Sequence, residues 1–450
     1  MDAFNENSNE QQAQQPMGCL HRFSKTIKVV IIGLLILLLM IPMFMIENLI
    51  SERGRTQEEA IDEVSEKWSL AQTITGPYLN LQYPVVTENN GEKKVSIKDL
   101  ILFPDELTIN GQLKTEILKR SIYEVNVYQS ELTLKGSFSS EELKKSRIDM
   151  EQLQFDRAAI CLNLTDMRGI SEQISITLGD SVYIFEPGMD NRGIANTGVH
   201  AIANLSELKQ NKKLPYEIKI KLKGSQSLNF IPLGKTTRVD LKANWNTPSF
   251  TGNYLPNNRN ITEKEFSAQW QVLNLNRNYS QVMADYNTSN IKDIENSSFG
   301  VNFKIPVEQY QQSMRSAKYA ILIILLTFGV IFFTEIMNKT RIHALQYLLV
   351  GLALCLFYSL LLSFSEHVGF NPAYLLSSAL TIILVGGYMF GITKKKKPSL
   401  IMSGLLGILY LYIFVLIQLE TFALLAGSLG LFIILAMVMY FSKKIDWFNE

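Results

Sequence analysis

The sequence contains little histidine, little cysteine and few charged residues for its length. Its 450 residues include four histidines and three widely separated cysteines, Cys19, Cys161 and Cys355. This spacing excludes a disulfide scaffold and a cysteine-rich zinc site. Charged residues make up 19%, whereas soluble domains average about 25%. The net charge of +1 also lacks the basic excess of a nucleic-acid-binding protein, so no nucleic-acid partner is expected.

Motifs of the common enzyme classes are missing as well. The chain has no glycine-rich phosphate loop, no HExxH and no GxSxG. Cys161 lies in the apolar run AAICLNL, which predicts a buried strand residue rather than a nucleophile. His200 has no Cys or His at metal-binding spacing and is expected to be a hydrogen-bonded surface or core residue. We therefore predict no catalytic residue, no cofactor and no metal site.

Long apolar runs are the dominant feature that is present. A helix needs about 20 apolar residues to cross a hydrocarbon core about 30 Å thick, and a helix satisfies its own backbone hydrogen bonds in lipid. Any single run could instead be a buried core helix, but five of them, separated by short turns, fill the C-terminal part. We therefore predict a polytopic α-helical membrane protein. Its six transmembrane helices are residues 29–46, 317–337, 345–364, 373–392, 400–418 and 422–441.

Basic residues next to these runs predict the topology, because cytoplasmic loops are enriched in Lys and Arg. The loops on the opposite side, 365–372 and 419–421, contain neither residue type. Both termini are therefore expected in the cytoplasm and residues 47–316 outside. The first run has no small-x-small cleavage site after it, which predicts an uncleaved signal anchor. The basic clusters are Arg22, Lys25 and Lys28; Lys339 and Arg341; Lys394 to Lys397; and Lys443 with Lys444.

Outside these spans, the sequence predicts two tails, a stalk and one large exported region. The tails are residues 1–28, whose Asn- and Gln-rich start is expected to be disordered, and residues 442–450. Residues 47–69 have a helical pattern and form the stalk, with Gly54 as a candidate break. Residues 70–316 form a large β-rich, sandwich-like periplasmic domain, or two smaller ones, between the first and second spans.

Alternating sequence carries the β prediction. Tyr216, Ile218, Ile220 and Leu222 alternate with charged residues, as in a strand with one buried and one hydrated face. Further strands are expected around residues 123–127, 174–178, 182–185 and 238–245, and short helices near residues 140–146 and 205–211.

Several long strings resemble the CreD family of bacterial inner-membrane proteins. They lie at residues 166–170 (DMRGI), 244–256, 266–270, 308–335, 346–370 and 443–448. The resemblance implies a cell-envelope-integrity protein of the inner membrane. In Gram-negative bacteria the family is tied to a two-component regulon, colicin tolerance, and β-lactam and envelope-stress phenotypes. It implies no defined molecular activity and no catalytic or ligand residues.

Ionisable residues at membrane depth are candidate functional groups, because they are costly there. Glu335 could reach the headgroup zone beside Lys339 or act within the helix bundle. Glu366 and His367 could form an ordinary interfacial pair or serve a proton- or ion-linked role. Gly386 and Gly387 are expected to let helices approach closely.

These observations favour a non-enzymatic protein that supports envelope integrity. Its expected partners are membrane lipids and an unidentified periplasmic or envelope component. An ion- or proton-linked transporter of an envelope solute is the main alternative. Against it, the C-terminal helices show no inverted repeat and no paired broken helices with charges at the midplane. An intramembrane hydrolase is weaker, because no Asp pair or Ser–Lys pair lies at mid-depth.

Overall fold

The computed structural model describes the chain over residues 24–89, 92–146, 148–189, 194–195, 197–210, 212–284, 288–303, 308–338, 341–419 and 422–443. The chain divides into two compact units. The first combines Met1–Thr56 with Val307–Glu450, and the second is Gln57–Pro306. Most of the predicted N-terminal and C-terminal tails lies outside the described residues, as do Cys19 and Lys339.

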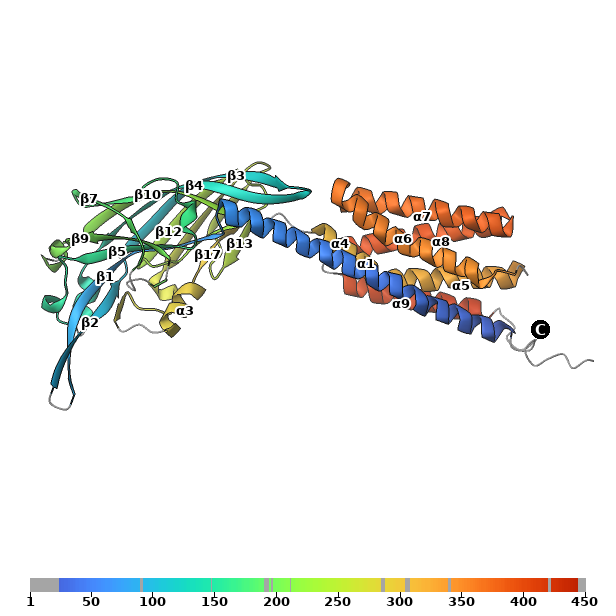
Figure 1. Cartoon of the computed structure of the whole chain (residues 1–450), viewed down its shortest axis with the longest axis horizontal. Helices are drawn as coiled ribbons and strands as arrows, with labels where there is room; N and C mark the ends of the chain where they lie inside the picture. The colour runs from blue at the N-terminus through green and yellow to red at the C-terminus, as the bar shows by residue number, and fades with distance from the viewer. Residues whose placement is uncertain are drawn as a thin grey trace, which may run out of the picture. The chain divides into compact units, whose positions relative to one another are not determined.

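The first unit is helical (Figure 1). Five of its helices, α1, α5, α6, α7 and α8, are long and apolar enough to cross a membrane, which confirms five of the six predicted spans as such helices. The described apolar stretch of α9, Leu424–Met437, is shorter, so the sixth span stays a prediction. The helices are α1 Ser24–Trp68, α4 Glu308–Lys318, α5 Ala320–Asn338, α6 Ala344–Val368, α7 Phe370–Thr393, α8 Lys396–Gln418 and α9 Ala423–Ser442.

Helix α1 contributes to both units, because the boundary between them falls after Thr56. It runs for 45 residues without a break through Pro42 and Gly54, so the expected break at Gly54 is wrong. A glycine costs a helix only about 1 kcal/mol relative to alanine, which is small for a helix of this length. The first span and the stalk are therefore one element.

Gly386 of α7 lies close to α8, as predicted for the paired glycines, whereas a Cβ atom on Gly387 would meet nothing within 4 Å. A Cβ atom on Gly386 would lie 2.2 Å from the Ser403 Oγ. The Ser399 Oγ donates a 2.6 Å hydrogen bond to the Gly386 carbonyl. The missing side chain at Gly386 leaves room for the two serines of α8, which is how small residues act between membrane helices.

The second unit consists mainly of two β-sheets, which confirms the predicted β-rich domain (Figure 1). The first sheet contains β1 Gln72–Asn89, β2 Glu92–Leu102, β5 Ala158–Leu164, β8 Glu186–Pro187, β9 Gly198–Ala203, β11 Ser227–Phe230, β13 Ser249–Gly252, β16 Val282–Ala284 and β17 Phe299–Asn302. The second contains β3 Glu106–Arg120, β4 Tyr123–Phe138, β6 Ser175–Leu178, β7 Ser181–Ile184, β10 Leu214–Ser225, β12 Thr236–Ala243, β14 Asn258–Ile261 and β15 Phe266–Leu273.

Short helices connect the strands. They are α2 Glu141–Lys145 and α3 Thr288–Asn296, with the 3₁₀ turns η1 Met150–Gln152, η2 Met167–Gly169, η3 Ser206–Gln210 and η4 Asn274–Asn276. The two helical segments predicted near residues 140–146 and 205–211 are confirmed as α2 and η3.

Side chains of both sheets share one hydrophobic core. Leu134 of β4 and Ile218 of β10 face each other across a strand pair of the second sheet, and Ile160 of the first sheet belongs to the same cluster. The apolar residues of β10 alternate with exposed or half-exposed charged ones, as predicted. Most strand pairs are antiparallel, whereas β1–β11 and β3–β12 are parallel.

The first sheet is covered on both faces, which explains the apolar run in β5. All seven residues of that strand are buried. Cys161 belongs to a second cluster with Phe103 and Ile294 of α3, on the opposite face from Ile160. The prediction that Cys161 is a buried strand residue is therefore confirmed.

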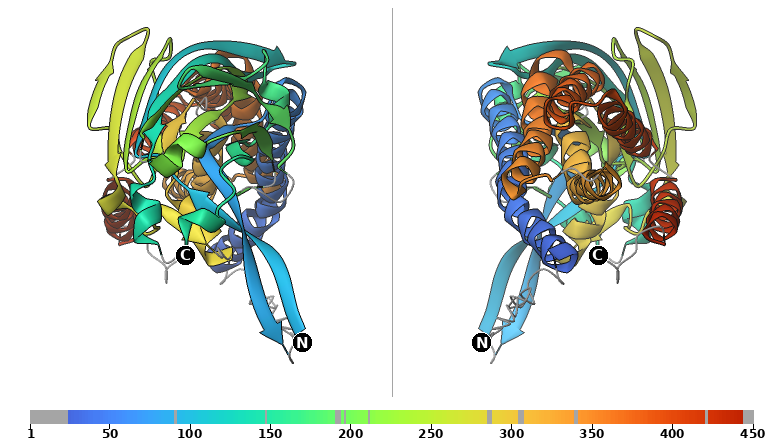
Figure 2. Two further views of the ribbon diagram at one scale, coloured as in Figure 1. Left: turned by 90° about the vertical axis from the view of Figure 1, so that its left-hand side faces the viewer. Right: turned by 90° about the vertical axis from the view of Figure 1, so that its right-hand side faces the viewer.

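Strands β1 and β2 extend beyond the rest of their sheet as a two-stranded ribbon (Figure 2). Residues 81–89 pair with residues 92–100, and β2 gains a further partner, β16, only at residues 100–102. The ribbon exposes the apolar side chains of Val86, Val95 and Ile97.

Candidate functional site

Glu335 forms a polar cluster inside the helical unit. One carboxylate oxygen accepts hydrogen bonds from the Lys28 ammonium of α1 and from the Ile342 backbone N–H at 3.1 Å. The other oxygen accepts a 3.1 Å bond from the Tyr347 hydroxyl of α6. The Tyr347 ring packs edge-on against Phe328 of α5, which fixes the hydroxyl in place.

This geometry favours the second of the two interpretations of Glu335, a role within the bundle. The side chain is only 10% exposed and both of its oxygens have donors. A buried carboxylate is tolerated when it is paired and hydrogen-bonded in this way. Lys28 supplies the compensating charge, although its sequence position suggested only a topological signal.

Glu366 forms a second cluster near the C-terminal end of α6. It accepts a 3.0 Å hydrogen bond from the Tyr310 hydroxyl of α4 and lies 3.8 Å from the Arg53 Nε of α1. The Glu366 side chain is 13% exposed, whereas Arg53 is about half exposed. The arginine is therefore a partly hydrated partner, and Tyr310 makes the shorter contact.

His367 does not join this cluster. Its side chain is exposed, and no ion pair with Glu366 exists among the described residues. Successive residues on a helix point in directions about 100° apart, so neighbours at i and i+1 do not face each other. A functional role for Glu335, Glu366 or His367 stays a prediction.

Helix α1 is the shared partner of both carboxylates. Lys28 and Arg53 are 25 residues apart, which is about 37 Å along a helix. Between them, Leu39, Met43 and Ile50 are buried. A Cβ atom on Gly351 of α6 would lie 2.2 Å from the Leu39 side chain. Leu39 of α1 therefore contacts α6 at Gly351, and an acidic side chain pairs with α1 on either side of this contact.

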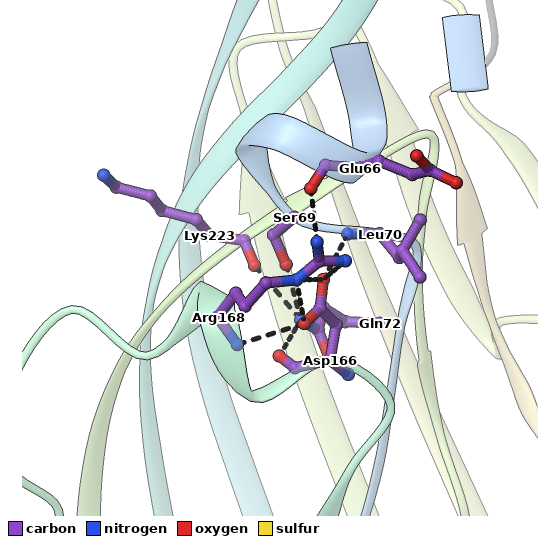
Figure 3. A network of polar contacts seen from close by, with 7 residues as sticks. All are labelled: Glu66, Ser69, Leu70, Gln72, Asp166, Arg168 and Lys223. Carbon is purple, nitrogen blue, oxygen red and sulfur yellow. Dashed lines mark hydrogen bonds and ion pairs between the residues drawn. The ribbon is translucent and has the colours of Figure 1, made fainter. Parts of the chain in front are cut away.

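The other end of α1 meets a polar network in the β-rich unit (Figure 3). The Asp166 carboxylate accepts hydrogen bonds from the Leu70 N–H at 2.9 Å and from the Arg168 guanidinium at 2.9 and 3.0 Å. The Arg168 Nη1 donates a 2.6 Å bond to the Glu66 carbonyl. Because the last four carbonyls of a helix lack helical partners, Arg168 caps the C-terminus of α1.

Gln72 ties the same loop to the start of β1. Its Nε2 donates to the Ser69 hydroxyl at 2.9 Å and to the Asp166 carbonyl at 2.7 Å, and its Oε1 accepts from the Asp166 N–H at 3.2 Å. Gln72 and Ser69 are fully buried. The network therefore joins the last turn of α1, the start of β1 and the loop before η2.

The Asp166 carboxyl is held in its charged form. Burial raises its pKa. The hydrogen bonds from the Arg168 side chain and the Leu70 N–H together lower the pKa by more than burial raises it, so the net pKa lies below the ordinary value. The same pairing raises the pKa of Arg168. Asp166 therefore stabilises the fold above the ordinary carboxyl pKa of about 4.

Acidification is expected to weaken this network. The contribution of Asp166 is fully present above the pKa of the unfolded chain and is lost as the pH falls through the lower folded-state pKa. The unfolding midpoint of the purified protein should therefore drop below about pH 4, and Asp166→Asn should flatten this dependence. Tryptophan fluorescence measures it, because Trp68, Trp245 and Trp270 all lie in the second unit. An identical pH profile for the variant would contradict the assignment.

Gly169 leaves the space that the network requires. A Cβ atom there would lie 2.4 Å from the Lys223 carbonyl and 2.8 Å from the Gln72 Nε2. Gly169→Ala is therefore expected to destabilise the protein by about 2 kcal/mol, measured by denaturant unfolding with tryptophan fluorescence. Gly54→Ala is the control, because a Cβ atom at Gly54 meets nothing within 4 Å. If Gly169→Ala were as stable as Gly54→Ala, a Cβ atom at residue 169 would not clash with its neighbours, which would contradict this prediction.

Charged side chains also join the last turns of α1 to β3. Glu63 accepts hydrogen bonds from Lys67 at 2.6 Å and from Arg120 at 3.1 Å. The Lys67 bond, together with the Arg120 charge, lowers the pKa of Glu63. The Lys223 ammonium lies 4.8 Å from the centre of the Trp68 ring. A cavity of about 270 Å³ remains between these elements, lined by Glu63, Val64, Lys67, Trp68, Leu118 and Arg120.

Cys161 and His200 become direct cross-strand neighbours, which their sequence spacing did not show. They pair in the β5–β9 ladder, and the His200 Nδ1 lies 2.6 Å from the Gly188 carbonyl. The described residues contain no group of three His, Cys, Asp or Glu that could hold a metal ion. Cys161 is 0% and His200 is 9% exposed, so the pair is packed within the first sheet.

Comparison with known proteins identifies the family. A family model described as "Inner membrane protein CreD" matches residues 24–448. The chain belongs to the CreD family. The "Inner membrane protein CreD" of Escherichia coli (strain K12) is 32% identical over 420 residues, which cover 92% of this chain and 91% of that relative. The match includes both units, so this protein has the family's inner-membrane character and several membrane-spanning helices.

Sequence reasoning found the carboxylates of the helical unit but missed the polar network of Asp166 at the C-terminal end of α1. Asp166, Arg168 and Gly169 all lie in DMRGI, one of the strings that resembles the CreD family, yet nothing in that string names the end of α1 as its target. An Asp two residues before an Arg and three before a Gly was the available signal. Its partners, Glu66, Leu70 and Gln72, lie about 100 residues away in the chain.

Proposed function

We propose that this CreD family protein supports the integrity of the cell envelope from the inner membrane and does so without enzymatic activity. Six spans place both termini in the cytoplasm and the β-rich unit in the periplasm, where it contacts an envelope component. The basic clusters before the first span and in the turn at Lys394 support this orientation. The length of α9, 20 residues, supports a sixth crossing.

The continuity of α1 carries the proposal. One helix of 45 residues, about 68 Å long at 1.5 Å per residue, contains Lys28 and Arg53 of the membrane unit and the capped turn at Glu66. A load or ligand on the β-rich unit pulls on that capped turn, and the helix transmits the pull to the ion pairs of Glu335 and Glu366. The bundle then changes the strength or geometry of those pairs.

Thiol labelling in intact cells tests the topology. Cys19, Cys161 and Cys355 are replaced, and one cysteine is introduced at exposed Lys219 or at exposed Lys395. A membrane-impermeant reagent is expected to label Lys219→Cys from outside and to label Lys395→Cys only after lysis. Labelling with the opposite sidedness would overturn the orientation.

In-cell photo-crosslinking tests the envelope contact. A photoreactive residue replaces Val95 or Ile97, which the β1–β2 ribbon exposes, or Glu263, which is exposed elsewhere in the same unit. An envelope protein or polymer is expected at the ribbon positions. Capture of cytoplasmic components only would contradict a periplasmic role.

Membrane lipids are the second proposed partner. A cavity of about 370 Å³ lies between α5, α8 and α9, and apolar side chains such as Leu326, Phe333 and Ile433 line it together with Gly329 and Gly430. Because this lining is apolar, a lipid hydrocarbon chain is the occupant that matches the cavity.

A proton- or ion-linked transporter is the second candidate function, and the buried carboxylate of Glu335 favours it. The two functions differ in reconstituted vesicles. Transport predicts proton-coupled solute movement that Glu335→Gln or Glu366→Gln abolishes. Envelope support without transport predicts no movement in any of the three proteins.

A further inference from the structure

Helix α7 carries a polar stripe on its buried side. Tyr374, Ser377, Ser378 and Thr381 follow the i, i+3, i+4, i+7 spacing of one helix face, and each is at most 7% exposed. The opposite side of α7 exposes Leu375, Leu376, Leu380, Ile383 and Leu384. The helix is therefore polar inward and apolar outward, which in a membrane places the polar side chains in the bundle interior.

Tyrosines of α6 and α8 face this stripe. The Phe357 ring of α6 packs against the rings of Tyr374 and Tyr410, with centroids 5.4 and 4.4 Å away. The Tyr374 hydroxyl donates a 2.8 Å bond to the Tyr410 carbonyl. The Tyr358 ring packs edge-on against the Phe357 ring, with centroids 4.8 Å apart. Tyrosines of three helices therefore form one cluster around the Phe357 ring.

Several of these hydroxyls have no hydrogen-bond partner in the described chain. The Tyr358 hydroxyl and the Ser377 Oγ are buried without one, on residues only 1% and 0% exposed. The Tyr410 hydroxyl is also buried without a partner, on a residue 2% exposed. The Thr381 hydroxyl already donates to the Ser377 carbonyl at 2.9 Å. Leaving such groups unsatisfied in an apolar interior is costly.

We propose that the interface of α6, α7 and α8 encloses a polar site that binds water bridging Tyr358, Ser377 and Tyr410. A buried water needs two to four polar partners, and these three hydroxyls with Thr381 supply that number. A water both donates and accepts, which suits hydroxyl groups. A monovalent cation fits less well, because the named groups are neutral and supply no compensating charge. This hydrated site goes beyond the proposed envelope function and does not depend on it.

Hydroxyl removal tests the site in the purified full-length protein. Tyr358→Phe and Tyr410→Phe are each expected to lower the thermal unfolding midpoint by a few degrees, because each change takes a partner from the bridging water. Tyr358→Phe/Tyr410→Phe together should lower it by less than the sum, because both changes disrupt the same water. Higher midpoints would show unsatisfied hydroxyls in a dry interior and would overturn the proposal, as would unchanged midpoints or fully additive losses.

A matched variant and a direct observation complete the test. Tyr374→Phe removes a hydroxyl that already donates to a carbonyl, so it should lower the midpoint whether or not water is bound, which calibrates the assay. An experimental structure at about 2 Å resolution should show ordered density within hydrogen-bonding distance of the Tyr358 and Tyr410 hydroxyls. Side chains packed against these hydroxyls with no room for water would overturn the proposal even if a variant failed to fold.

Discussion

Replacing Glu335 with alanine is expected to lower the free energy of unfolding of the helical unit by about 3–5 kcal/mol. The change leaves the Lys28 ammonium without its carboxylate and removes the acceptor of the Tyr347 hydroxyl and of the Ile342 N–H. Unfolding of the full-length protein in mixed micelles, followed by far-ultraviolet circular dichroism, measures the loss.

Two further variants distinguish the loss of the Lys28–Glu335 ion pair from a nonspecific loss of stability. Lys28→Met/Glu335→Met removes both charges together and should cost less than the sum of the single changes, because neither charge is left unpaired. Glu52→Ala alters an exposed residue of α1 whose carboxylate makes no hydrogen bond or ion pair with the described part of the chain. That variant should stay within about 0.5 kcal/mol of the parent protein. Equal stability of Glu335→Ala and Glu52→Ala would contradict the role of Glu335 as an anchor of α1.

Asp166→Ala is expected to lower the stability of the β-rich unit by about 3 kcal/mol. It removes the acceptor of the Leu70 N–H and leaves the Arg168 guanidinium without its charged partner. Arg168→Ala should act in the same direction, because it also uncaps the Glu66 carbonyl. Arg168→Lys should not restore stability, since an ammonium cannot reproduce the two-nitrogen contact with a carboxylate.

Tryptophan fluorescence during denaturant unfolding reports this effect, and Trp68 lies at the affected turn of α1. Glu263→Ala, in an exposed loop of the same unit, is the matched acidic control and should change the midpoint little. If Asp166→Ala unfolded at the same denaturant concentration as Glu263→Ala, the network in Figure 3 would not hold the end of α1.

Elements with a strong local signal could be predicted from the sequence. The membrane helices follow from apolar length, and β10 follows from the alternation between Tyr216 and Leu222. The burial of Cys161 follows from an apolar run with no charged residue. In each case one short window contains the information, because helix and strand geometry turns local spacing into a buried face.

Features that depend on distant partners could not be predicted. Lys28 and Glu335 are 307 residues apart, and either could have faced the headgroups. The parallel β3–β12 pairing depends on how the chain returns to the sheet rather than on the pattern of either strand. The continuity of α1 through Gly54 was also misjudged, since a local helix-breaking signal was outweighed by the hydrogen bonding of a long helix.

Inserting seven residues into α1 between Arg53 and Gln57 tests most directly whether this helix links the two units. A flexible GGSGGSG insert interrupts the helix, whereas AEAAAKA continues it for about two turns and nearly preserves the facing of its residues. In a strain that lacks the protein, the helical insert should restore resistance to envelope stress and the flexible insert should not, with both proteins folded and present at equal levels. Full restoration by the flexible insert would contradict transmission along α1.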